Sequence, residues 1–304
     1  YLSRNMMVNL TLEPDPNPWD KTYGNQILWI CHVSFIVFSF GCVCAFACYR
    51  LYQYKVRKEK AMAKLFILIL VAVFCVECAV GWLDPIGSLG IYSYKVSTLL
   101  SSIHFPFGLT IYFLLVLYWA EVTKGFTPNF TKIMKPFACV TPLFFLAEFA
   151  SWIPRFMFYD TGIILMGLLL MYIVGFALAT IFYLKNGIQI IMALNKQSKM
   201  LARRSAVKKL NFYILFIAGC HALDTIMFAV YLIIGIGPIF NPVLYWVHAT
   251  FTLAITLSEV LMFPEAPSSN DTELQQYHAA MGYTQSSTLS DAVATGSGTF
   301  SEQE

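Results

Sequence analysis

Residues Ala63–Leu83 read AKLFILILVAVFCVECAVGWL, an apolar run in which Lys64 and Glu77 are the only charged side chains. A helix rises about 1.5 Å per residue, so a run of this length crosses the hydrocarbon core of a bilayer, which is roughly 30 Å thick. Six other stretches have a similar length and character. The seven predicted spans are Gln26–Tyr49, Ala63–Leu83, Val96–Ala120, Lys135–Pro154, Gly162–Leu184, Leu210–Gly235 and Val243–Phe263. The sequence therefore predicts an all-α fold, a seven-transmembrane helix bundle.

The composition agrees with a membrane location. Hydrophobic residues make up 58% of the chain and charged residues 12%, and the mean hydropathy is +0.64. These values are outside the range of soluble domains. We expect an integral, multi-pass protein of the plasma membrane or an endomembrane, with membrane lipid as a partner. The basic residues are explained as flanks of the spans, so no nucleic acid is expected as a partner.

The basic residues also predict an orientation. Of the 20 Lys and Arg residues, 16 lie at the first, third and fifth connections, and four lie on the opposite side. Basic residues near the ends of spans are retained in the cytoplasm. The sequence therefore places the N-terminus outside and the C-terminus in the cytoplasm.

Three regions follow from this topology. Residues 1–25 form an exterior N-terminal segment, residues 26–263 the seven-transmembrane domain, and residues 264–304 a cytoplasmic tail. The exterior segment carries the sequon Asn9-Leu10-Thr11, so Asn9 is a predicted glycosylation site. The tail has six acidic and no basic residues, is rich in Ser and Thr, and is expected to be disordered.

The connection between the fifth and sixth spans, Lys185–Lys209, is longer than most of the others. Apolar residues alternate in it with Lys and Arg, which predicts that both flanking helices continue into the cytoplasm as amphipathic extensions. A cytoplasmic protein could dock on these extensions, and Arg203 and Arg204 are the candidate contacts. A solvated helix–turn–helix without a partner explains the pattern equally well.

Ionisable side chains inside the spans are the candidates for function. Each costs about 2.5–3.5 kcal/mol at a helix centre on insertion scales, so these side chains should face the interior of the bundle. The ligand-pocket candidates, in the outer half or the middle of the membrane, are His32, Glu77, His104, Glu148, His221, Asp224 and His248. Together they predict a polar cavity open toward the exterior. Taken singly, each is explained at least as well by an interhelical hydrogen bond.

Prolines and short connections add two expectations about the helices. Pro106, Pro142 and Pro242 should bend the third, fourth and seventh spans and free backbone carbonyls. Because most connections are short, consecutive helices should be antiparallel neighbours.

The layout is that of G-protein-coupled receptors, but the local signatures of that class are missing. The third span ends in Leu117-Tyr118-Trp119-Ala120-Glu121-Val122, without an Asp-Arg-Tyr motif, and the sixth has no Cys-Trp-x-Pro. Whether a cytoplasmic partner is a G protein therefore stays open. A rhodopsin is disfavoured, because the seventh span has no lysine to bind retinal.

The third span carries one family resemblance. Residues Phe107–Glu121 read FGLTIYFLLVLYWAE and resemble the third span of the plant tobamovirus multiplication protein family, with its Thr-Tyr-x-Leu-Leu-Val-Leu-x-Trp-Ala-Glu run. The match departs at Thr110-Ile111-Tyr112, where the family has adjacent Thr and Tyr. The resemblance implies a seven-span, receptor-like membrane protein or scaffold without catalytic residues. It also makes Trp119 and Glu121 candidate contacts for a cytoplasmic partner.

These observations predict a receptor-like protein with an exterior polar pocket that binds an unknown ligand and signals or scaffolds through its basic cytoplasmic loops. No enzymatic activity, cofactor or metal is expected. Two alternatives stay open. One is a proton-coupled small-solute transporter that uses the His and carboxylate groups as a relay. The other is an intramembrane zinc hydrolase built on His104, His221, Asp224 and His248.

Overall fold

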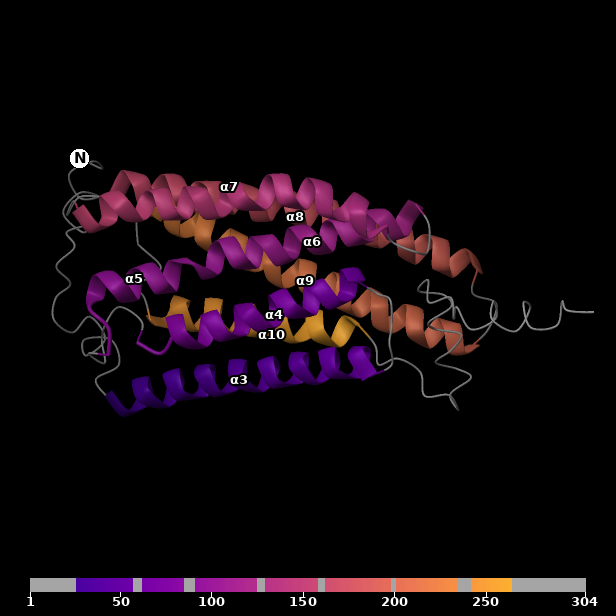
Figure 1. The fold of residues 1–304 in the computed structure, drawn as a ribbon, viewed down its shortest axis with the longest axis horizontal. Coiled ribbons are helices and arrows are strands. Elements are labelled where there is room, and N and C mark those ends of the chain that lie inside the picture. The colour runs from indigo at the N-terminus through magenta and orange to yellow at the C-terminus, as the bar shows by residue number, and fades with distance from the viewer. Residues whose placement is uncertain are drawn as a thin grey trace, which may run out of the picture.

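The computed structural model describes residues 26–56, 62–84, 91–124, 129–157, 162–197, 201–234 and 242–263. Within these ranges every regular element is an α-helix, and no strand occurs. The helices, labelled as in Figure 1, are α3 (Gln26–Val56), α4 (Met62–Gly81), α5 (Tyr94–Ser102), α6 (His104–Lys124), α7 (Phe130–Met157), α8 (Gly162–Gln197), α9 (Leu201–Ile234) and α10 (Pro242–Met262). The all-α prediction is confirmed for this part of the chain. Asn9, the 1–25 segment and the 264–304 tail lie outside it.

The described helices confirm a multi-pass membrane protein. Six stretches are long and apolar enough to cross a bilayer: Ile30–Val56, Met62–Gly81, Lys95–Thr123, Phe130–Pro154, Met166–Met192 and Lys208–Val230. The seventh predicted span coincides with α10, whose apolar stretch Trp246–Met262 is shorter. Large apolar side chains such as Phe38, Leu146 and Ile181 are exposed on the outside of the bundle, as expected for helices surrounded by lipid.

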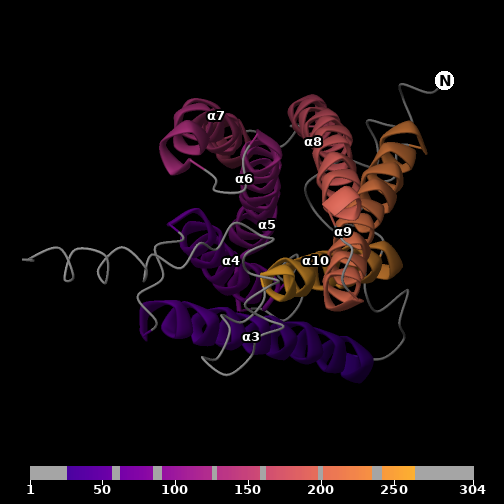
Figure 2. The ribbon, with the colours of Figure 1, turned by 90° about the vertical axis from the view of Figure 1, so that its right-hand side faces the viewer.

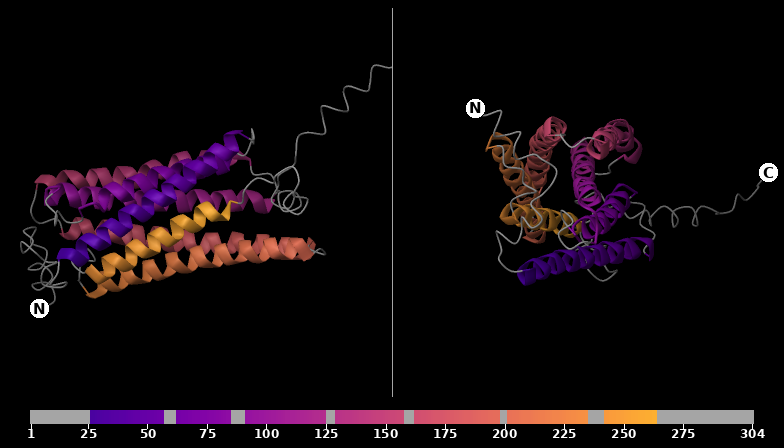
Figure 3. Two further views of the ribbon diagram at one scale, coloured as in Figure 1. Left: turned by 90° about the horizontal axis from the view of Figure 1, so that it is seen from below. Right: turned by 90° about the vertical axis from the view of Figure 1, so that its left-hand side faces the viewer.

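Helix α6 lies at the centre of the packing. It contacts α4, α7 and α8, and its side chains Tyr112, Leu115 and Trp119 are fully buried. Helix α3 pairs with α4, α8 pairs with α9, and α10 packs against α9, α3 and α4. Figures 2 and 3 show α3 at the edge of the bundle across from α7 and α8.

One expectation about neighbours is wrong. Helices α7 and α8 are consecutive in the sequence, yet they touch at few residues, and each packs more extensively on α6. The gap between their ribbons in Figure 2 reflects this arrangement. A short connection limits the distance between two helix ends, but it does not decide which apolar faces meet.

The third predicted span is interrupted. Helix α5 ends at Ser102, Ile103 follows as its cap, and α6 begins at His104. The cause is Pro106, which has no N–H to donate to the carbonyl of Ser102 four residues earlier. Pro142, by contrast, lies inside the continuous helix α7, and Pro242 is the first residue of α10, where a proline is well tolerated.

Helices α8 and α9 are longer than a bilayer requires. They have 36 and 34 residues, or about 54 and 51 Å of helix. Their ends around the α8–α9 connection project beyond the other helices (Figures 1 and 3). The prediction that both helices continue past the fifth and sixth spans is confirmed.

Candidate functional site

A small polar cavity lies between α4, α6, α8, α9 and α10. Its polar lining consists of His104, His221, Asp224, His248, Thr252, Thr256 and Glu259, and Phe74, Ile111 and Phe176 are among its apolar walls. The volume of this cavity that is open to water is about 30 Å³. This is room for roughly two or three water molecules, so the cavity in this state suits water or a small ion.

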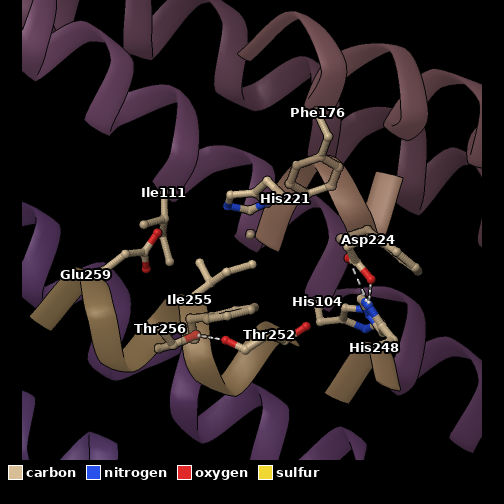
Figure 4. A pocket seen from close by; sticks show the side chains of 13 residues that line it. His104, Ile111, Phe176, His221, Asp224, His248, Thr252, Ile255, Thr256 and Glu259 are labelled. Carbon is tan, nitrogen blue, oxygen red and sulfur yellow. Dashed lines mark hydrogen bonds and ion pairs between the residues drawn. The ribbon is translucent and has the colours of Figure 1, made fainter. Parts of the chain in front are cut away.

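A chain of hydrogen bonds joins three helices at one end of the cavity (Figure 4). His104 Nε2 of α6 lies 2.8 Å from His248 Nε2 of α10. His248 Nδ1 in turn lies 2.9 and 3.0 Å from the two carboxylate oxygens of Asp224 on α9. An ionised carboxylate only accepts, so His248 donates from Nδ1. A neutral His248 then accepts at Nε2, and His104 is the donor of the first bond.

Aromatic side chains enclose this chain. The Trp82 ring lies edge-on to His104 and His248, with centroids 5.6 and 5.9 Å away. Phe105 stacks on His248 at 5.6 Å, and Phe228 meets the same imidazole edge-on at 4.9 Å. These rings fix the orientation of the imidazoles and place the hydrogen bonds in a low-dielectric surrounding, where they are electrostatically stronger than in water.

His221 occupies a different wall of the cavity. It precedes Asp224 by one helical turn on α9, and its ring is stacked on Tyr112 at 3.8 Å and on Phe176 at 5.3 Å. Its Nε2 atom is buried and has no hydrogen-bond partner among the described residues. His221 therefore lines the cavity without joining the His104–His248–Asp224 chain.

Glu259 was not among the predicted pocket residues, yet it lines the same cavity. Its side chain is 3% exposed and comes from α10. Glu259 follows His248 by eleven positions, about 16 Å along the helix, so the carboxylate lies well toward the other end of the bundle. The sequence did carry a signal: positions 248, 252, 256 and 259 follow helical spacing and share one face of α10.

Three of the predicted pocket residues lie apart from the cavity. His32 of α3 stacks on Trp246 with ring centroids 3.9 Å apart. Glu77 of α4 is half-buried and accepts a weak hydrogen bond from the Cys78 thiol, at 3.7 Å. Glu148 of α7 forms a separate cluster.

The Glu148 cluster ties α7 to its neighbours. Its carboxylate is 1% exposed and accepts hydrogen bonds from Ser102 Oγ at 2.5 Å, Trp152 Nε1 at 3.0 Å and the Tyr172 hydroxyl at 2.8 Å. These donors come from α5, α7 and α8. A buried carboxylate with three donors is well satisfied, and this geometry supports a structural role. The cluster also bridges α7 and α8, which otherwise touch little.

The predicted partner contacts are spread over the other end of the bundle. Trp119 is fully buried and packs edge-on against Tyr118, so its ring is not accessible to a docking protein in this state. Glu121 is half-buried near the end of α6. Arg203 and Arg204 lie in the first turn of α9.

The residues proposed for a zinc site are not arranged around a common metal position. Within the described ranges, no group of three or more His, Cys, Asp or Glu side chains is arranged to hold a metal ion. His104, His248 and Asp224 bond to one another instead of converging on a common point, and His221 is stacked between two aromatic rings.

Comparisons with known proteins leave the family open. No protein-family model matches the chain, and no curated protein matches it. The resemblance of Phe107–Glu121 to the tobamovirus multiplication protein family therefore stays a prediction.

Proposed function

We propose that this chain is a receptor-like seven-helix membrane protein in which occupancy of the polar cavity controls the position of α9. One observation carries the proposal. Helix α9 holds Asp224, the end of the buried hydrogen-bond chain, and the same helix continues into the long extension that bears Arg203 and Arg204.

The linkage is mechanical. From Asp224 to Arg204, α9 covers about 30 Å. A change in the hydrogen bond at Asp224 alters how α9 packs on α10, and a rigid helix carries a small tilt to its far end. A ligand that binds one arrangement of the chain better than the other shifts the population toward that arrangement.

The predicted orientation gives each end of α9 a role. With the N-terminus outside, the His104–His248–Asp224 chain lies toward the exterior and the extensions of α8 and α9 lie in the cytoplasm. The basic extension suits a cytoplasmic protein partner with an acidic surface. The resemblance in the third span is in keeping with a receptor-like protein.

A proton-coupled transporter is the second candidate, because the third span is interrupted next to the cavity. Discontinuous helices at the binding site are a recurring feature of secondary transporters. Here the break between α5 and α6 falls at Ile103, the residue before His104, whose imidazole begins the hydrogen-bond chain.

Breaking the chain tests the receptor proposal. Spin labels are attached through Lys132→Cys on α7 and Lys208→Cys on α9, both exposed, after the exposed cysteines Cys31, Cys42, Cys48 and Cys139 are replaced by Ser. The distribution of distances between the two labels is then measured in nanodiscs, and we expect Asp224→Asn to shift it.

The matched control is Thr225→Val, on the adjacent residue, whose hydroxyl bonds to the carbonyl of His221 in the same helix. It should leave the distribution unchanged. An unchanged distribution in Asp224→Asn would overturn the receptor proposal, and proton-driven solute uptake by reconstituted protein would assign the cavity to transport.

A further inference from the structure

Glu259 is a buried acid that neither the hydrogen-bond chain nor the movement of α9 uses. Its carboxylate is directed into the cavity, and Figure 4 marks no hydrogen bond from it to the other residues that line this space. A buried carboxylate without a partner is costly. Water in the cavity is the partner that the geometry offers.

The cavity connects Glu259 with His221. The two side chains come from α10 and α9, and both line the same space, which has room for roughly two or three water molecules. Thr256 lines the same space and donates its hydroxyl to the carbonyl of Thr252 at 2.6 Å, which leaves its oxygen able to accept from water. The elements of a short water-mediated path are therefore present.

We propose that Glu259 is a proton-binding site that exchanges its proton with His221 through the cavity water. In one direction, protonated His221 gives a proton from a ring nitrogen to a water molecule, which passes a proton to the Glu259 carboxylate. The products are a neutral imidazole and a neutral carboxylic acid. The reverse transfer restores the imidazolium and the carboxylate, so the small species that this cavity handles is the proton.

Several ionisable neighbours of Glu259 are groups that are ordinarily uncharged. Cys75 of α4, Tyr112 of α6 and Tyr183 of α8 are in electrostatic contact with it. A thiol and two phenols are ordinarily neutral near pH 7. From α9, His221 and Asp224 face the shared cavity.

Infrared difference spectroscopy on the full chain in nanodiscs, recorded between two pH values, tests the proposal. We expect the carbonyl stretch of a protonated carboxylic acid that disappears at high pH and is lost in Glu259→Gln. The band should shift on transfer to D₂O, because cavity water reaches the acid. His221→Phe keeps the stacked ring, and it should retain the band while moving its titration midpoint and slowing its deuteration.

Glu148→Gln is the matched control, because Glu148 is equally buried but held by Ser102, Trp152 and Tyr172. It should leave the band in place. If Glu259→Gln does not fold, Glu259→Asp keeps the acid and should show a band at a changed frequency. A band that survives Glu259→Gln, or that does not exchange in D₂O, would overturn the proposal.

This inference rests on the cavity of the proposed function but not on the movement of α9, and the two fail separately. A titrating Glu259 band together with an unchanged label distance in Asp224→Asn would retain the proton site and remove the receptor. A shifted label distance with no Glu259 band would retain the receptor and remove the proton site.

Discussion

The buried polar side chains of this bundle are of two kinds: some are bonded to protein donors, and others face the cavity. Glu148 is surrounded by donors, and its geometry supports a structural role. His221 and Glu259 both face a small cavity, and His221 Nε2 has no hydrogen-bond partner among the described residues. The cost of burying charge in lipid identified His104, His221, Asp224 and His248 from the sequence alone. It could not separate them from Glu148, because the donors to a buried carboxylate come from other helices.

The structural role of Glu148 predicts a loss of stability in Tyr172→Phe. This change removes the hydroxyl that donates to Glu148 Oε2 at 2.8 Å and keeps the ring stacked on Phe105. We expect a destabilisation of about 0.6–2 kcal/mol, the range for an interhelical hydrogen bond in a membrane. Unfolding in mixed micelles measures it, with Tyr213→Phe as the control. An equal effect of the two substitutions would contradict the role assigned to the cluster.

The size of the cavity predicts the effect of Gly108→Ala. A Cβ at Gly108 would lie 3.7 Å from Phe176 Cζ and 3.8 Å from Phe74 Cζ, which is ordinary contact, so the variant should fold. The added methyl group takes part of the small space open to water and should slow deuteration of the Glu259 acid several-fold. Gly41→Ala on α3, with nothing within 4 Å of its Cβ, should not change the rate. Equal rates in the two variants would place the water path elsewhere.

The presence and length of the helices could be predicted from the sequence more readily than their packing partners. The apolar runs and the pattern in Lys185–Lys209 predicted the helices and their long extensions. They did not predict that α6 would be the main neighbour of both α7 and α8, because every helix in lipid is apolar on most of its faces. The interruption at Ser102–His104 was foreshadowed by Pro106, whereas Pro142 left α7 continuous.

The close packing of α8 on α9 predicts a large effect of Gly187→Ala. A Cβ at this position would lie 2.6 Å from Cγ2 of Ile214, an atom next to the backbone of a stiff, β-branched side chain. The two helices would have to separate, at a cost of about 1–3 kcal/mol. Thermal unfolding in detergent measures it. Gly167→Ala on the same helix has nothing within 4 Å of its Cβ and should cost little. Similar values for both would show that α8 and α9 can separate freely.

For the whole molecule, the positions of the two ends of α10 relative to the membrane decide how the cavity works. The proposed receptor needs the His104–His248–Asp224 chain toward the exterior and the extended ends of α8 and α9 in the cytoplasm. The proton site gains direction from the same orientation, because Glu259 then lies deeper from the exterior than His248 by about 16 Å. The uneven distribution of Lys and Arg is the physical basis for this orientation.

Cysteine labelling at the two ends of the third predicted span tests the orientation. Ile91 and Thr123 are exposed; Ile91 precedes α5, and Thr123 is the last residue but one of α6. With the exposed native cysteines replaced by Ser, Ile91→Cys should react with a membrane-impermeant maleimide applied to intact cells. Thr123→Cys should react only after the membrane is opened, and because the two sites belong to one span, each is the control for the other.

If the protein resides in an endomembrane, sealed vesicles of known orientation replace the cells, and the lumen takes the place of the exterior. The reversed pattern would direct the histidine chain to the cytoplasm, so that cytoplasmic protons would reach it first and the extensions of α8 and α9 would face away from any cytoplasmic partner.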